Sequence, residues 1–394
     1  MRTCTIVTRS YVPFARVLAT SFLNKHPSGT LTALVFDAEV GEIEGEPFEV
    51  WTPDDLRLSP SEFRRMAMIY NALEFSTALK PFLLERLLDG SDQPVTYFDA
   101  DIQVFAPLGD IDHRARDSEI VLTPHLLSPI TRDGLLPSEA SILKAGVYNL
   151  GFLALGRNHA MLPWWQDRLR RHCLADSDDE SFVDQRWIDF VPGLWDHWIL
   201  RDAGCNVAYW NVDQRTVAHD GAGYTVNGHA LRFFHFSGYS PDRPDELSRY
   251  QTRTTLRDHP TLARLCDDYG RRLLDAGFDE FRDVPYRYGA TGGGTPIDTT
   301  ARRAARSALL AHETDGADTP PPDPFDRGSG DDFVDFMRSP APGGRVSRYL
   351  DALWRRRPDL QMAFPDPGGA DADGYEEWAD IEGRHQDGVS PDYL

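Results

Sequence analysis

The sequence predicts an α/β protein: a mixed, mostly parallel sheet flanked by helices, followed by a helical C-terminal extension. Two observations lead to this fold class. Short apolar runs typical of buried strands alternate with amphipathic stretches through roughly the first 240 residues. Beyond them, helical patterns are separated by segments rich in Pro, Asp and Gly. Strand and helix in alternation indicate parallel strands, whose ligands bind beyond the carboxyl ends.

The individual elements follow from residue periodicity. Apolar runs predict strands at 3–8, 31–36, 95–98, 120–123, 147–155, 206–210 and 231–236. In the stretch 14–24, Val17, Leu18 and Phe22 fall on one face, as in an amphipathic helix. Similar patterns predict helices at 65–88, 262–274, 300–312 and 346–354.

Composition shifts suggest the domain boundaries. We expect an α/β domain at 1–240 and a helical extension at 241–312. The extension contains a glycine-rich loop, 289–295, which lacks the strand and helix of a phosphate-binding loop and is a candidate lid. The stretch 313–332 reads as a linker, because its Pro, Asp and Gly residues bury little apolar surface. A helical tail is expected at 333–394.

Charge and composition exclude several classes of protein. The 394 residues include 41 Lys plus Arg and 62 Asp plus Glu, a formal net charge of −21, which disfavours nucleic acid or a broad anionic surface as partner. Four dispersed cysteines without a C-x-x-C pair fit a reducing compartment. No apolar leader or membrane-spanning run is evident. We expect a cytoplasmic protein, with peripheral contact to the inner face of the membrane as an option.

The most informative motif is Asp99-Ala100-Asp101, which directly follows the apolar run 95–98. Carboxylates at positions i and i+2 of a strand end point the same way, so one hard cation fits between them and a phosphate. The alternative is an acidic turn without a metal. The same D-x-D pattern at 110–112, 176–178 and 371–373 is better interpreted as solvated turns. The strand-end position favours a metal at Asp99 and Asp101.

A series of segments in the first 240 or so residues carries a family resemblance. In order, they are TIVTRSYVPFARVLATSF, STALKPFLLERLL, YFDADIQVF, YNLGFLAL, FVDQRWIDFVP, NVAYWNV and FFHFSGYSP. This series resembles GT-A-fold glycosyltransferases, whose sheet is Rossmann-like, and is most similar to glycosyltransferase family 8. The resemblance implies a hexosyltransferase that uses a nucleoside-diphosphate sugar, with UDP favoured. It also implies retention at the anomeric carbon, with the leaving phosphate taking the acceptor proton.

The resemblance assigns nucleotide binding to several positions. The segment of Thr8 and Tyr11 is implied to hold the base, and Lys80, ahead of the D-x-D motif, to reach the nucleotide. Gly238 closes an H-F-x-G motif of the family. The family's Lys shortly after that motif, which touches the diphosphate, is missing here, and Arg243 is the nearest cation to replace it.

The metal site implied by the resemblance consists of Asp99, Asp101 and His235, with Ala100 between the carboxylates, and its ion is Mn²⁺ or Mg²⁺. From its own surroundings, His235 could equally be a buried histidine of an apolar strand. Departure of a nucleoside diphosphate requires ligands of this kind, because a metal held by carboxylates and imidazole stabilises the charge that develops on the leaving β-phosphate.

Asn149, Asp184 and Gln185 match the family's Asn and Asp-Gln positions, whereas Leu150 replaces the family's hydroxyl residue. Asp184 can accept hydrogen bonds from sugar hydroxyls, and Gln185 can lie beside a developing oxocarbenium centre. Asn149 can orient hydroxyls of donor or acceptor. The alternatives are a helix-capping aspartate and a strand-end turn.

The remaining features concern the acceptor, expected to be a natural product, a lipid-linked glycan or a surface glycan. The segment 346–379 resembles a tail of bacterial, especially actinobacterial, glycosyltransferases, and would pack on the catalytic domain or recognise the acceptor. Arg clusters at 302–306 and 355–357 are interpreted as solvated helix faces, with contact to a lipid-linked acceptor as the alternative. The tryptophans between Trp164 and Trp210 are assigned to core packing, with sugar stacking as the alternative.

Two other functions compete with this interpretation. A nucleotidyltransferase of a related fold also uses paired Asp and metal, but normally carries a glycine-rich, basic N-terminal loop, which TRSYVPF is not. A non-catalytic nucleotide-sugar-binding protein is disfavoured by the presence of Asp99, Asp101, Asp184 and His235.

Overall fold

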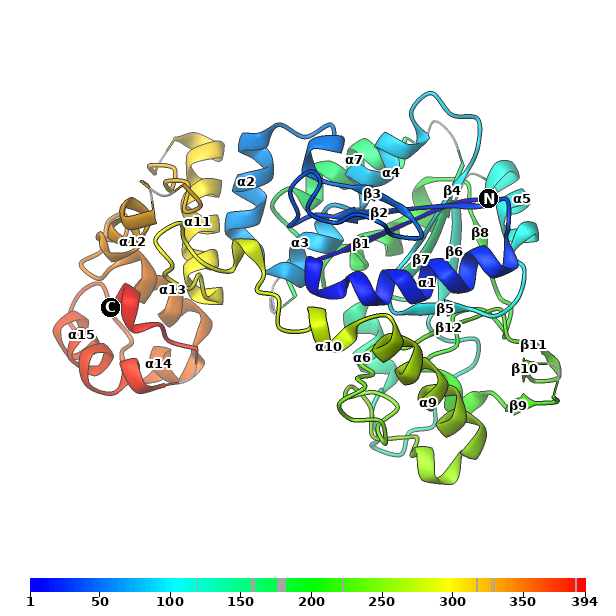
Figure 1. Cartoon of the computed structure of the whole chain (residues 1–394). Helices are drawn as coiled ribbons and strands as arrows, with labels where there is room; N and C mark the ends of the chain where they lie inside the picture. The colour runs from blue at the N-terminus through cyan, green and yellow to red at the C-terminus, as the bar shows by residue number, and fades with distance from the viewer. Residues whose placement is uncertain are drawn as a thin grey trace. The chain divides into compact units, whose positions relative to one another are not determined.

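The structure, a computed structural model, describes the chain except for residues 119, 157–159, 176–181, 222, 317, 327, 329 and 387. It forms two compact units (Figure 1). The first comprises Met1–Arg57 and Ser76–Pro285, and the second Leu58–Phe75 and Tyr286–Leu394. This division differs from the predicted boundaries at 240, 312 and 332. The D-x-D pattern at 176–178 and parts of the predicted linker lie outside the described residues.

A seven-stranded mixed sheet forms the centre of the first unit, in the order β3-β2-β1-β4-β7-β6-β8. Its strands are β1 (Arg2–Val7), β2 (Thr30–Val35), β3 (Glu49–Trp51), β4 (Val95–Phe98), β6 (Ile120–Pro124), β7 (Tyr148–Leu155) and β8 (Trp198–Ile199). β7 runs antiparallel to β4 and β6, and the other neighbouring strands are parallel. The predicted fold class, a mixed and mostly parallel sheet, is confirmed.

Helices cover both faces of this sheet, with α1 on one side and α4 and α7 on the other (Figure 1). The helical segments of the first unit are η1 (Arg9–Tyr11), α1 (Val12–Lys25), η2 (Pro53–Asp55), α4 (Lys80–Leu88), α5 (Gly109–Ser118), α6 (Glu139–Ala145), α7 (Met161–Leu169), η3 (Arg186–Phe190), α8 (Val191–Leu194), η4 (Val212–Gln214), η5 (Leu256–Asp258), α9 (Pro260–Asp275) and α10 (Phe278–Phe281). Pro13 lies in the first turn of α1, where its fixed φ suits the helix and its missing N–H has no helical partner to lose.

Two small sheets complete the first unit. β9 (Val217–His219), β10 (Tyr224–Val226) and β11 (His229–Ala230) form one of them, and β5 (Ile102–Val104) pairs antiparallel with β12 (Phe233–His235) in the other. The predicted strand at 206–210 is wrong: only a single bridge joins Val207 to Phe234. The predicted helix at 65–88 is divided into α2 (Pro60–Ile69), α3 (Ala72–Ala78) and α4.

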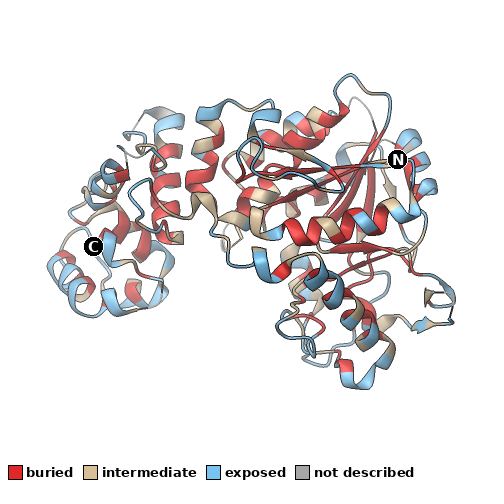
Figure 2. Ribbon diagram, viewed as in Figure 1, coloured by how far each residue is buried: buried red, intermediate tan, exposed pale blue. Residues whose placement is uncertain are grey.

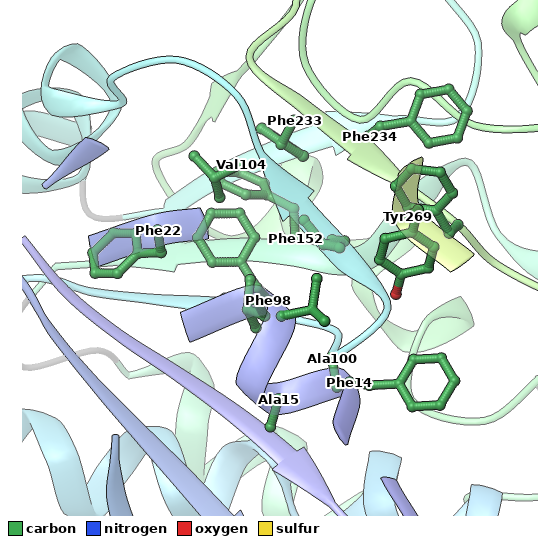
Figure 3. Packing of buried hydrophobic residues seen from close by; sticks show 14 of the residues in the cluster. Phe14, Ala15, Phe22, Phe98, Ala100, Val104, Phe152, Phe233, Phe234 and Tyr269 are labelled. Carbon is green, nitrogen blue, oxygen red and sulfur yellow. The ribbon is translucent and has the colours of Figure 1, made fainter. Parts of the chain in front are cut away.

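The main core of the first unit lies where β4, β7 and β12 meet (Figure 3). Phe152 packs on Phe98 and Phe233, with ring centroids 5.6 and 5.3 Å apart. Tyr269 of α9 stacks on Phe236 at 3.7 Å, so residues beyond 240 share this core. In the main sheet, β1, β2, β4, β6 and β7 are buried along most of their length (Figure 2).

The second unit is helical. It contains α2, η6 (Arg287–Gly289), α11 (Thr299–Asp315), α12 (Gly330–Arg338), α13 (Arg348–Arg356), α14 (Pro358–Ala363), α15 (Ala372–Ile381), η7 (Gly383–His385) and η8 (Pro391–Tyr393). Arg302 of α11 is 3% exposed and donates to the carbonyls of Ala67, Met68 and Tyr70. The interpretation of 302–306 as a solvated face is therefore wrong, because these guanidinium donors are satisfied inside the unit.

The glycine-rich loop and the acidic stretch after α11 have partners within the second unit. Thr291 N–H donates to Thr295 O at 2.8 Å, and Gly292 N–H donates to Pro324 O at 2.7 Å. Asp318 forms a partly buried ion pair with Arg348. Among the described residues, no helix combines the length and apolar character needed to cross a membrane.

Candidate metal centre and its surroundings

Asp99, Asp101 and His235 come together at the carboxyl end of β4, the central strand of the main sheet. Their candidate ligand atoms all lie within 4.8 Å of one another. Nε2 of His235 is 3.0 Å from Asp101 Oδ1 and 3.8 Å from Asp99 Oδ2. The Asp99 and Asp101 side chains are 33% and 23% exposed, so the cluster opens to solvent. Two carboxylates and one imidazole fit Mn²⁺ or Mg²⁺.

The local fold explains why these residues meet. Asp99 directly follows β4 and Asp101 directly precedes β5, while the β5–β12 register places His235 opposite Ile102. Phe236 N–H donates to Asp101 O at 2.9 Å and closes this pairing. A Cβ at Gly151 of β7 would lie 2.3 Å from Cε1 of His235, so only glycine admits the imidazole here.

The electrostatics of His235 reflect its two acidic neighbours. Burial lowers the pKa of His235, but Asp101 and Asp99 outweigh it, and the pKa is raised above its ordinary value. A bound cation requires the neutral ring, so it would displace that proton. Nδ1 of His235 is buried without a hydrogen-bond partner among the described residues.

A buried ion pair lies directly beside the cluster. The ammonium of Lys80 is 2.9 Å from Asp184 Oδ2 and 3.6 Å from Asp99 Oδ1, and it donates to Leu150 O at 3.0 Å. Burial raises the pKa of Asp184 to about 6, although Lys80 opposes this shift. Desolvation acts against the charge of Lys80, but Asp184 and Asp99 outweigh it and raise its pKa. The ammonium is therefore held within the protein, and its predicted contact with nucleotide stays a prediction.

Apart from the buried Lys80, the predicted nucleotide-binding residues outside the metal cluster lie on exposed or half-buried segments. Tyr11 is 49% exposed and stacks on Phe14 at 4.6 Å. Thr8 Oγ1, just after β1, lies 2.9 Å from Ser10 Oγ. Gly238 has a φ of 74°, in the left-handed region that favours glycine. Arg243 is exposed and pairs with Glu246 at 3.2 Å, so its predicted role on the diphosphate stays a prediction.

Three side chains of this region had no role predicted from the sequence, and a fourth, Trp210, was expected only to pack in the core. Tyr97 O–H donates to Asp99 Oδ1 at 2.9 Å. His125 and Asn206 bond to Asn149, and the ring of Trp210 packs between those of His125 and His235, 5.1 Å from each. His125 follows the predicted strand 120–123 almost directly, which is the signal that could have drawn attention to it.

The comparisons with known proteins place the chain in no family. No family model matches it. It is 27% identical over 205 residues to the uncharacterised protein YfnF of Bacillus subtilis (strain 168), covering 49% of this chain and 65% of YfnF. The match to YfnD of the same strain is 25% over 177 residues, covering 42% of this chain and 54% of YfnD. The chain thus spans less than two thirds of the length of either relative.

Similar solved structures include several glycosyltransferases. The galactosyltransferase LgtC, in complex with donor and acceptor sugar analogues, is 16% identical with a TM-score of 0.43, covering 73% of this chain and 99% of LgtC. GlyE of Streptococcus pneumoniae TIGR4 is 13% identical with a TM-score of 0.40, covering 72% of this chain and 64% of GlyE. Mouse xyloside xylosyltransferase 1 is 13% identical with a TM-score of 0.35, covering 59% of this chain and 96% of the xylosyltransferase. We therefore base the function on the site itself.

Proposed function

We propose that this protein is a metal-dependent glycosyltransferase that moves a sugar from a nucleoside-diphosphate sugar to an acceptor hydroxyl. The observation that carries the proposal is the cluster of Asp99, Asp101 and His235, whose two carboxylates are partly exposed, beside the buried Lys80–Asp184 pair. A divalent cation there would supply Lewis-acid stabilisation for the charge on the leaving diphosphate. The open side of the cluster leaves space for phosphate oxygens.

The chain's own residues would divide the remaining work. Asp99 and Asp101 hold the cation, and His235 completes the set from a strand that pairs with β5. The resemblance to family 8 favours UDP as the nucleotide, Tyr11 as a contact to its base, and retention of the anomeric configuration. The acceptor is a hydroxyl of a natural product, a lipid-linked glycan or a surface glycan.

Incubation with a panel of nucleotide sugars and Mn²⁺ tests the proposal through release of nucleoside diphosphate. We expect release from a UDP-sugar, with GDP-sugars weaker, and none after chelation. Release of pyrophosphate from a nucleoside triphosphate and sugar phosphate would instead identify a nucleotidyltransferase. Binding of UDP without turnover of any donor would identify a binding protein.

Retention needs a separate measurement, namely proton NMR of the newly formed linkage. We expect the anomeric configuration of the product to equal that of the donor. The opposite configuration would remove the enzyme from the retaining group and require a catalytic base, because inversion needs a group that activates the acceptor on the opposite face.

A further inference from the structure

Behind the metal ligands lies a network of buried polar side chains in the first unit. His125, Asn149, Gln185 and Asn206 are 4%, 7%, 8% and 0% exposed. Buried amides are costly unless they are paired, so their partners reveal how the network is oriented.

The amide of Asn149 has one orientation, and all its hydrogen-bond donors and acceptors are used. Its Oδ1 accepts from Gly151 N–H at 3.2 Å, a backbone group that can only donate, and from Asn206 Nδ2 at 3.0 Å. Its Nδ2 then faces Gln185 Oε1 at 3.2 Å and His125 Nε2 at 3.3 Å. Two lone pairs and two N–H groups are all used within the protein.

Gln185 is oriented by backbone groups in the same way. Its Oε1 accepts from Leu150 N–H at 2.9 Å as well as from Asn149, and its Nε2 donates to Ala145 O at 2.9 Å. Because a backbone N–H cannot accept and a carbonyl cannot donate, the amide cannot be reversed. Both lone pairs of its oxygen are therefore engaged inside the protein.

These contacts determine the tautomer of His125. Nε2 must accept from the Asn149 amide, so the proton lies on Nδ1, which is 3.3 Å from Val147 O. The neutral ring suits this place, because burial lowers the pKa of His125 to about 4. His125 thereby links the end of β6 to the start of β7.

The network continues to the charged pair beside the metal cluster. Gln185 holds the N–H of Leu150, and the carbonyl of the same Leu150 accepts from the Lys80 ammonium. The position of this residue's backbone therefore determines where Lys80 meets Asp184 and Asp99.

We propose that His125 is a positioning residue that acts through Asn149 on the ammonium of Lys80. Asn149 holds the start of β7 in register. The consequence for turnover rests on the proposed function, whereas the orientation of the network does not.

The orientation is tested on the wild-type protein by nitrogen NMR of labelled histidines, with His125→Gln used to identify the signal. We expect pyrrole-type Nδ1 and pyridine-type Nε2 shifts for His125 at neutral pH. The reverse tautomer, or a cationic ring, would overturn the proposal. This measurement requires no catalysis, so it stands even if no donor sugar is found.

The effect on turnover is tested with His125→Leu, which removes the acceptor, and His125→Gln, which offers an amide oxygen near the position of Nε2. We expect His125→Leu to lower kcat by about 100-fold, the cost of misplacing a reacting group by about 1 Å, and His125→Gln to recover most of it. The dissociation constant of UDP with Mn²⁺ should change less than kcat in both.

His26→Leu is the matched control, because His26 Nε2 also accepts a hydrogen bond, from Leu108 N–H at 2.9 Å. It should lower thermal stability but not kcat. Wild-type kcat in folded His125→Leu, or a fall in kcat as large in His26→Leu, would overturn the proposal. If His125→Leu fails to fold, Asn206→Asp replaces it, since a carboxylate facing Asn149 Oδ1 repels it; unchanged kcat there would count equally against the proposal.

Discussion

The metal-binding face and the amide network behind it are both built from polar side chains of the first unit, but they differ in unused bonding capacity. Asp99 and Asp101 are partly exposed, and their cluster opens to solvent. Asn149 has all its donors and acceptors engaged within the protein. The open face is suited to binding a ligand, whereas the closed network is suited to holding that face in place.

The comparison also separates two kinds of mutational effect. Removal of a side chain with unused bonding capacity lowers ligand affinity or turnover, because that side chain meets its partner only in the complex. Removal of a saturated buried group costs folding free energy first, since its partners are left unpaired.

Asp101→Ala should reduce turnover by about 1,000-fold or more, because loss of a ligand forfeits several kcal/mol of charge stabilisation. Mn²⁺ should raise the Tm of the wild type by mass action and leave that of the variant unchanged. Asp373→Ala is the control, since this carboxylate is 85% exposed and pairs with Arg345. Full activity of Asp101→Ala in the presence of chelator would contradict a metal-dependent reaction.

Lys80→Met should lower the free energy of unfolding by about 3–5 kcal/mol, because it leaves the carboxylate of Asp184 buried without its counter-charge. The double variant Lys80→Met/Asp184→Asn should regain part of this loss. Urea titration at pH 7 measures both, with the exposed Lys25→Met as a near-neutral reference. A single-variant cost below about 1 kcal/mol would show that the pair is not buried as described.

The buried neutral ring of His125 should make the free energy of unfolding decrease as the pH falls. Its pKa is about 4 in the folded protein against 6.5 for the ordinary group, so between these values the unfolded chain binds a proton that the folded chain does not. Stability contributed by the neutral ring is complete above pH 6.5 and is reduced by about 3 kcal/mol by pH 4.

The readout for this prediction is the difference in unfolding free energy between wild type and His125→Gln, measured at several pH values. Other titrating groups are common to both proteins and cancel in the difference. Parallel pH profiles for the two proteins would mean that His125 takes up a proton as easily when folded as when unfolded.

Gly151→Ala should disturb both the metal-binding face and the amide network, because a Cβ there would lie 2.6 Å from His235 Nδ1 and 2.9 Å from Asn149 Oδ1. We expect a loss of about 2 kcal/mol in stability and a roughly 10- to 100-fold weaker Mn²⁺ affinity. Gly193→Ala is the matched control, since a methyl group added at Gly193 would meet no described atom within 4 Å. Isothermal titration calorimetry measures the Mn²⁺ affinity of each variant. A Gly151→Ala protein that binds Mn²⁺ as tightly as the wild type would contradict the predicted crowding of His235.

The elements nearest the site were predictable because their signals are local. The strand at 95–98 coincides with β4, and the acidic pair follows the end of that strand, as predicted. The strand expected at 206–210 did not form: Asn206 has a φ of 49°, and the buried Trp210 packs against two histidines. An apolar run signals burial, but not the backbone conformation in which it is buried.

Long-range pairing explains the other differences. The arginines at 302–306 looked solvated, because nothing in their neighbourhood along the chain reveals that the carbonyls of Ala67, Met68 and Tyr70 accept from Arg302. The same holds for His125, whose importance depends on Asn149 and not on its sequence neighbours.

Periodicity and strand-end carboxylates act over a few residues, so the alternation of strands and helices, the mostly parallel sheet and the residue types able to hold a cation are readable from the sequence. The meeting of His235 with Asp99 and Asp101, the enclosure of Lys80 by Asp184 and Leu150, and the full use of the hydrogen-bonding groups of Asn149 depend on the folded chain. These contacts join segments far apart in the chain, where strand register and the pairing of polar groups are set by packing of the whole unit.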